Sequence, residues 1–340
     1  MKELKSYFQQ EDEKAKYDRR ERNNQNTIQD NILAWMFLGL VNEEYIKKGW
    51  YSSLLTRNQL EKAVHLKLST IECLYDSINQ LQLNNTQVKT LKWFETNVPE
   101  KQVMLEDIIN ECQHFSHEII PFFSDDYPAI LKSTDYPSPV LYCKGTKKIA
   151  DLAKNRCIAI VGTRNPSWYG HVKSREIAKE LAASGFTVVS GLARGIDTNS
   201  HVGAIAGKGN TVAVLGSGFQ HLHPAENSEL VNDIEKNGAV LSEHHPRVKG
   251  NRHYFVPRNR IISGLCQGSL IIEGSAKSGT RTQAKYTIDQ GRLLFVLEQL
   301  DETRKTSELP LELLKQKNTY SNIYTVKTGK EIAAVVGKVI

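Results

Sequence analysis

The stretch RVKGNRHYFVPRNR, residues 247–260, places five basic side chains among aromatic rings. The basic residues are Arg247, Lys249, Arg252, Arg258 and Arg260, and the rings are His253, Tyr254 and Phe255. Arginine and lysine bind phosphate oxygens, and an aromatic ring can stack on a nucleobase of any type. No Asp or Glu opposes these charges from His244 to Ile272, a run of 29 residues. The pattern favours a site for single-stranded nucleic acid. The alternative is a solvated loop in which Phe255 only closes the edge of a domain.

Four other loops carry glycine and polar residues directly after apolar runs. In IVGTRNPSWYG (160–170), Gly162 lets the backbone approach a ligand, Thr163 offers a hydroxyl and an amide, and Arg164 offers a fork of donors. A helix that begins after this loop adds the positive end of its dipole, so the loop suits a phosphate.

The remaining three loops are simpler. VVSGLARGID (188–197) supplies Gly191 and Gly195 for tight backbone, with Asp197 expected to cap the next helix. VLGSGFQHLHP (214–224) is the third loop. IIEGSAKSGTRTQA (271–284) leads through Ser278, Gly279 and Thr280 into a helix, which predicts a nest of backbone amides. In any one loop the glycine could serve only the turn, but convergence of several on one sheet edge predicts an anion site.

Residues for acid–base or metal chemistry are few. The candidates for an acid–base pair are Asp197, His201, His221, His223, Glu243 and Glu273. Asp197 and His201 lie four apart at an expected helix start, where a helix cap beside a helical histidine is the simpler interpretation. His244 and His245 are adjacent and lack the HxH or HExxH spacing of metal sites. We therefore expect no catalytic residue and no metal.

Neither glycine motif predicts a cofactor. Gly216 and Gly218 form a GxG pair, but His221 stands where a dinucleotide fingerprint needs its third glycine. Lys208 follows Gly207 as in a phosphate-binding P-loop, yet Gly209 replaces the required Ser or Thr.

The loops are positioned by short β-branched runs that alternate with helical stretches. Strands are expected over Cys157–Val161, Thr187–Val189, Thr211–Leu215, Ala239–Leu241, Leu270–Ile272 and Leu293–Leu297, and helices over Val172–Ser184, Ala225–Asn237 and Thr282–Gln290. The runs do not alternate apolar with polar residues, as is typical of a parallel sheet that is covered on both faces. The fold class is therefore α/β, a doubly wound and mostly parallel sheet with ligands at the carboxyl ends of its strands.

The rest of the chain differs in composition. We expect a polar, possibly disordered arm over residues 1–27, a helical N-terminal domain over 28–117 and the α/β domain over 118–340. The net charge of +6 permits an anionic partner, and five scattered cysteines without a CxxC pair favour a reducing cytoplasm. The apolar stretch Ile32–Val41 is too short to cross a membrane and is expected to be a buried helix.

The motifs together resemble the DNA-processing protein A family (DprA/Smf). The resemblance covers residues 118–300 and includes FSDDYPAIL, PSPVLY, IAIVGTRNPSWYG, SGLARGID, TVAVLGSG, RNRIISGL and the later DQGR. It implies an extended Rossmann-like fold that binds single-stranded DNA without sequence preference, forms homodimers and helps to load the RecA recombinase in natural transformation.

The resemblance also implies roles for individual residues. Arg164 matches a phosphate-gripping arginine, Arg252 a basic residue and Phe255 a base-stacking ring. Arg258 and Asn259 match the RN motif, and Ser278, Gly279 and Thr280 match the SGS/SGT loop. The usual FPxRN order reads FVPRN here, Arg281 stands where an apolar residue is common, and residues 28–117 lack a helix-hairpin-helix glycine signature.

Two other functions remain open from the sequence. A related Rossmann-like group hydrolyses the N-glycosidic bond of nucleoside monophosphates with a PGGxGT loop, whereas this chain reads EGSAKSGT. A nucleotide-binding sensor could use the same phosphate loops for a small ligand. Small nucleotides should saturate a sensor, whereas a strand-binding protein should respond only to oligomers.

Overall fold

The computed structural model describes residues 31–50, 53–68, 73, 77, 80–95, 98–154, 156–299 and 301–339. The expected arm over residues 1–27 lies outside this range. One sheet of nine strands organises the chain, in the order β1-β2-β6-β5-β4-β3-β7-β8-β9. The strands are β1 (Glu118–Pro121), β2 (Val140–Gly145), β3 (Cys157–Val161), β4 (Thr187–Ser190), β5 (Thr211–Leu215), β6 (Gly238–Ser242), β7 (Gly268–Ile271), β8 (Leu293–Leu297) and β9 (Ile323–Val326).

The parallel part of the sheet confirms the expected fold class. Strands β6 through β9 in the sheet order run parallel, and β3, β5, β6 and β8 are buried along their whole length. All six expected strands are present, three of them with the expected bounds. Burial on both faces explains why these strands read as continuous apolar runs.

The antiparallel edge was not predicted. Strand β2 pairs antiparallel with both β1 and β6. Its first residues belong to the segment PSPVLY (137–142), whose two prolines and serine are typical of a turn and obscure the start of a strand. Strand β9 was also missed, because its four residues are only partly buried and give no clear pattern.

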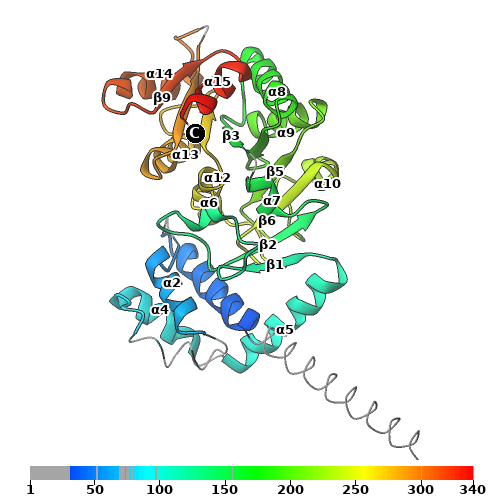
Figure 1. Cartoon of the computed structure of the whole chain (residues 1–340), viewed down its shortest axis with the longest axis vertical. Coiled ribbons are helices and arrows are strands. Elements are labelled where there is room, and N and C mark those ends of the chain that lie inside the picture. The colour runs from blue at the N-terminus through cyan, green and yellow to red at the C-terminus, as the bar shows by residue number, and fades with distance from the viewer. Residues whose placement is uncertain are drawn as a thin grey trace, which may run out of the picture.

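Helices cover both faces of the parallel strands (Figure 1). One face carries α8 (Trp168–Ala183), α9 (Ile196–Ala206) and α15 (Gly329–Val339), whose apolar side chains join Ile158 and Ile160 of β3 in one buried cluster. The other face carries α12 (Asn259–Gly264), α13 (Gly279–Asp289) and α14 (Glu308–Lys315), which join Ala159 and Val161 in a second cluster. This alternation along β3 is the period of a strand, and it makes the fold doubly wound.

Further helices lie in the α/β part. They are α6 (Ala129–Lys132), α7 (Ile149–Lys154), α10 (Ser228–Asn237) and α11 (Arg252–Phe255). The helix expected over Ala225–Asn237 is a 3-10 turn over Ala225–Asn227 that continues as α10. The helix expected over Thr282–Gln290 begins earlier, at Gly279.

The N-terminal region is helical, as expected, and lies at the β1 end of the sheet (Figure 1). Residues 31–47 form one helix, followed by α2 (Arg57–His65), α4 (Asn85–Glu95) and α5 (Val98–His114). Leu33 to Val41 are all buried, and the larger apolar side chains among them belong to the same cluster as the sheet. In the described ranges no helix is both long and apolar enough to cross a bilayer.

The strand order reverses between β3 and β7. From β3 the chain winds outward through β4, β5 and β6, and then returns to place β7 on the other side of β3. In a doubly wound sheet, the loops that leave such neighbouring strands separate and open a crevice at their carboxyl ends. The first loop (160–170) and the last loop (271–284) of the sequence analysis flank this point.

Candidate nucleic-acid interface

A pocket of about 590 Å3 opens at the carboxyl ends of the parallel strands, and we call it the central pocket. It contains ten of the eleven residues predicted for the site: Gly162, Thr163, Arg164, Arg252, Phe255, Arg258, Asn259, Ser278, Gly279 and Thr280. The eleventh, Gly191, lines an adjoining side pocket together with Arg164, Ala193, Arg194, His223, Pro224, Phe255 and Arg258. Loops that are up to 118 residues apart in sequence therefore meet at one rim, because Gly162 and Thr280 line the same cavity.

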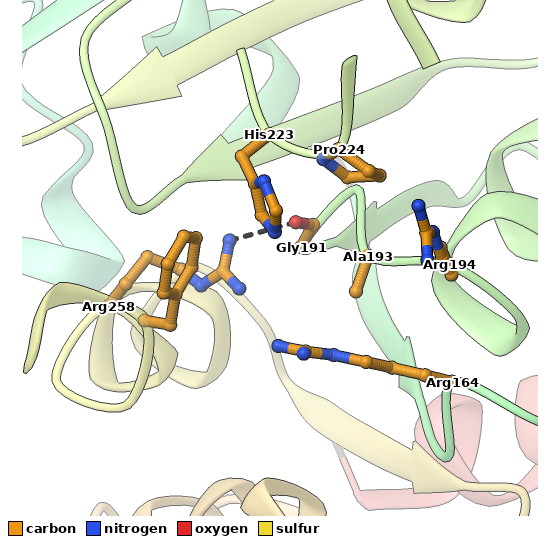
Figure 2. Close-up of a pocket in the computed structure, with 8 residues that line it drawn as sticks. Arg164, Gly191, Ala193, Arg194, His223, Pro224 and Arg258 are labelled. Carbon is orange, nitrogen blue, oxygen red and sulfur yellow. Dashed lines mark hydrogen bonds between the residues drawn. The ribbon is translucent and has the colours of Figure 1, made fainter. Parts of the chain in front are cut away.

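Arg164 supplies a free charge to both pockets. Its side chain is exposed, and no described residue forms a hydrogen bond or an ion pair with its guanidinium. Figure 2 shows it extending across the side pocket toward Arg258. Because nothing in the described chain neutralises it, this guanidinium is available to an anion from solvent.

Arg252 and Phe255 enter the central pocket from the short helix α11. Arg252 is exposed, and its Nε donates to the ring of His253 at 3.2 Å. The Phe255 ring lies over Gly216 in the loop after β5, where a Cβ atom would come within 2.7 Å of the ring. Glycine at this position therefore makes room for the ring.

Arg258 is buried and holds two loops together. Its Nη1 donates to the carbonyl oxygens of Gly191 (2.9 Å) and Val214, and Figure 2 shows the first of these bonds. A Cβ on Gly191 would lie 2.5 Å from Nη2 of Arg258, so glycine is needed there for the guanidinium to fit. Burial lowers the pKa of Arg258 to about 10, which leaves it charged at neutral pH, and the nearby Asp197 opposes this shift. We infer that Arg258 both shapes the pocket and adds to its positive potential.

Asp197 does not cap a helix, contrary to the sequence interpretation. The residue before α9 is Gly195, and no side chain caps that helix. The Asp197 carboxylate instead accepts hydrogen bonds from the amides of Gly191 (3.1 Å) and Ala193 (3.4 Å), because the loop folds back over the first turn of α9. Burial raises the pKa of Asp197 to about 6, against the opposing effects of Arg258 and the two amides.

The loop after β7 closes the other side of the central pocket. Ser278 precedes α13 without capping it, and its hydroxyl donates to the carbonyl of Ser275 at 2.8 Å. The N-terminal turn of α13 lines the pocket with Gly279 and Thr280, so its positive end faces the cavity. Asn259 links this turn to the RN motif, since its Nδ2 donates to the carbonyl of Gly279 at 3.4 Å.

Two arginines of the basic segment, residues 247–260, form ion pairs with acidic side chains from elsewhere in the chain. The absence of acids within the segment had not predicted these pairs. Arg260 forms a fully buried bidentate pair with Glu243, at 2.8 Å and 2.6 Å. Arg247 pairs with Glu111 of α5 at 2.7 Å. Only part of the segment is therefore available to a ligand. Arg281, the residue at an unusual position in the last loop, is likewise paired with Glu312 of α14.

Four of the six candidates for acid–base chemistry, Asp197, His201, Glu243 and Glu273, have structural partners. His201 is buried, its Nδ1 lies 2.7 Å from the Thr211 hydroxyl, and burial lowers its pKa to about 3. The Glu273 carboxylate accepts from the amide (2.9 Å) and hydroxyl (2.5 Å) of Ser167, which fixes the first loop. Glu243 is held by Arg260. In the part of the chain that the structure describes, no cluster of three or more His, Cys, Asp or Glu side chains could hold a metal ion.

The side pocket adds two residues that the sequence had not assigned to nucleic-acid binding. His223 is exposed, and its ring centre lies 5.4 Å from that of Phe255. Arg194 is exposed and paired with Glu226. Figure 2 places both at the rim, with Arg164 below them. The sequence carried a signal for His223, the HP dipeptide at the end of the third loop, but it gave no reason to place this ring beside Phe255.

Comparisons with known proteins agree with this geometry. Residues 118–328 match the family described as DNA recombination-mediator protein A. The chain is 44% identical over 178 residues to DNA processing protein DprA of Bacillus subtilis, covering 52% of this chain and 59% of that protein. It is 39% identical over 184 residues to Protein Smf of Escherichia coli, covering 54% of this chain and 48% of that protein. The matched segment thus spans about half of these curated relatives.

Two solved structures are also similar. DNA processing protein A of Streptococcus pneumoniae superposes with a TM-score of 0.68 at 26% identity, over 86% of this chain and 97% of that chain. DNA processing protein A of Helicobacter pylori, whose structure concerns its single-stranded DNA binding mode, superposes with a TM-score of 0.57 at 25% identity. That match covers 66% of this chain and 97% of the other.

Proposed function

Because the chain belongs to the DNA recombination-mediator protein A family, we propose that it binds single-stranded DNA without sequence preference at the central pocket. The observation that carries the proposal is that Arg164, Arg252 and Phe255 line one open cavity. Two exposed guanidinium groups can bind successive phosphates, while the Phe255 ring in the same cavity stacks on a base. None of these contacts reads the edge of a base, so the site should accept any sequence.

The chemistry of the rim supports binding rather than catalysis. Hydrolysis of an N-glycosidic bond needs a carboxylate positioned at the sugar or at the leaving base. Glu273 is engaged by Ser167, and Asp197 by backbone amides. We therefore propose that the protein is not an enzyme and holds its ligand without altering it.

Binding of a labelled oligo-dT, followed by fluorescence anisotropy, tests the proposal. Unlabelled oligo-dT and oligo-dA should compete equally, and AMP or CMP should not compete at similar nucleotide concentrations. Equal competition by mononucleotides would instead identify a small-nucleotide sensor. Release of free base from AMP or CMP on incubation with the protein would contradict the non-enzymatic role.

We extend the proposal to the cellular role on the strength of family membership. The protein would act in the reducing cytosol as a homodimer that protects incoming strands and helps to load RecA. Cys112, Cys143, Cys157 and Cys266 form no disulfide with a described residue, which is consistent with that compartment. Gel filtration with and without oligo-dT tests self-association, and a RecA strand-exchange assay tests loading. A monomer under both conditions would contradict the homodimer.

A further inference from the structure

Trp168 is the most exposed large apolar side chain in the described part of the protein, at 79%. It begins α8, inside the segment 160–170 that we call the first loop, and its ring belongs to neither buried cluster on the two faces of the sheet. No described ring stacks on it. An indole with this exposure contributes little to folding, because it removes almost no apolar area from water.

Trp168 lines a third cavity, which we call the tryptophan pocket, of about 610 Å3. Its lining residues are Arg164, Asn165, Pro166, Ser167, Trp168, His171, Gly195, Thr198 and Asn199. Arg164 lines this pocket as well as the central and side pockets. The free guanidinium of Arg164 is therefore the boundary between Phe255 on one side and Trp168 on the other.

The tryptophan pocket, like the central pocket, is lined by more basic than acidic side chains. It contains no Asp or Glu among its lining residues, and Arg164 is its one arginine. His171 is held by Asn199, whose Nδ2 lies 2.9 Å from the ring nitrogen Nδ1. An anionic strand that leaves the central pocket past Arg164 thus meets no repulsion here, and it meets an exposed aromatic face.

We propose that Trp168 is a second base-stacking platform, so that a bound strand runs from Phe255 past Arg164 to Trp168. The inference rests on the proposed function, since it extends the same strand by at least one nucleotide. A phosphate at Arg164 would lie between two bases, one stacked on each ring. Stacking of this kind is independent of base identity, because every base has a flat aromatic face.

The test compares Trp168→Ala and Trp168→Phe with the parent by anisotropy, using long oligo-dT. Trp168→Ala should bind about 5- to 150-fold more weakly, which corresponds to ~1–3 kcal/mol per stacked base at ~1.4 kcal/mol per tenfold. Trp168→Phe should retain most of the affinity. The matched control is Trp50→Ala: Trp50 is 46% exposed, stacks on Tyr45 and lines none of the three pockets.

Intrinsic fluorescence provides a second readout. A base stacked on Trp168 should quench the parent and the Trp50→Ala variant, and the Trp168→Ala variant should lose that quenching. If the parent binds oligo-dT while Trp168→Ala keeps full affinity, the second platform is wrong and the central pocket stands. If Trp168→Ala instead changes only the oligomeric state in gel filtration, the ring belongs to a protein contact and the inference is likewise wrong. If the parent binds no oligo-dT, the proposed function itself fails, and the inference fails with it.

Discussion

Replacing Arg164 with alanine should flatten the salt dependence of oligo-dT binding, whereas replacing Phe255 with alanine should leave it unchanged. The reason lies in the structure of the central pocket. Arg164 is exposed and has no partner in the described chain, so a phosphate bound there releases a counterion that the variant no longer releases. Phe255 contributes a neutral ring, and its loss removes a stack without removing a charge.

The two variants should change the salt dependence of affinity by clearly different amounts. Each phosphate contact on a single strand contributes about 0.7 to the slope of log affinity against log salt. Over a tenfold rise in salt, the ratio of parent to Arg164→Ala affinity should therefore shrink by about 5-fold. The ratio of parent to Phe255→Ala affinity should stay constant at about 5- to 150-fold, which corresponds to ~1–3 kcal/mol for one stacked base.

Anisotropy titrations at a series of salt concentrations measure both slopes. Arg57→Ala is the control, because Arg57 is a partly exposed arginine in α2, where it pairs with Glu61, donates to the carbonyl of Ser133 and lines none of the three pockets. That variant should match the parent in affinity and slope. The reasoning is refuted if Arg164→Ala keeps the parental slope, or if Phe255→Ala flattens the slope as much as Arg164→Ala does.

Three further predictions concern the supports of the site. Burial raises the pKa of Asp197 to about 6, so this side chain is charged above that pH and neutral below it. Oligo-dT affinity should therefore rise as the pH falls from about 7.5 to about 5, by about tenfold if bound phosphate raises the pKa of Asp197 by one further unit. Asp197→Asn should weaken this pH dependence. An Asp197→Asn variant with the full parental pH dependence would contradict the assignment of the effect to Asp197. Gly191→Ala should weaken DNA binding and lower the free energy of unfolding in urea by about 1–3 kcal/mol, because its Cβ would displace Arg258. Gly279→Ala should leave the free energy of unfolding unchanged, because a Cβ there has no neighbouring atom within 4 Å. Equal stability of the two variants would contradict this prediction. Arg260→Met should lower the free energy of unfolding by about 3–5 kcal/mol, because it leaves the Glu243 carboxylate buried without its charged partner. Arg247→Ala breaks a partly exposed pair and should lower it by no more than about 1 kcal/mol, so similar losses in both variants would refute the distinction.

Sequence alone determined the parallel core and the loops that carry the site. Strands that are buried on both faces must be apolar throughout, so runs such as Cys157–Val161 and Leu293–Leu297 were recognisable with their observed bounds. The chemistry of Arg164 could also be anticipated, because it follows a glycine at the carboxyl end of such a strand. These features are local, and a local pattern is enough to predict them.

Only the tertiary structure decided which side chains form ion pairs and hydrogen bonds with each other. The run from His244 to Ile272 contains no acid, yet Arg247 and Arg260 meet Glu111 and Glu243, which lie outside that run. Asp197 faces backbone amides of its own loop instead of capping a helix. Opposite charges pair across space and not along the sequence. The packing of the whole chain therefore decides which distant segments come within a few ångströms of each other, and so which charges remain free for DNA.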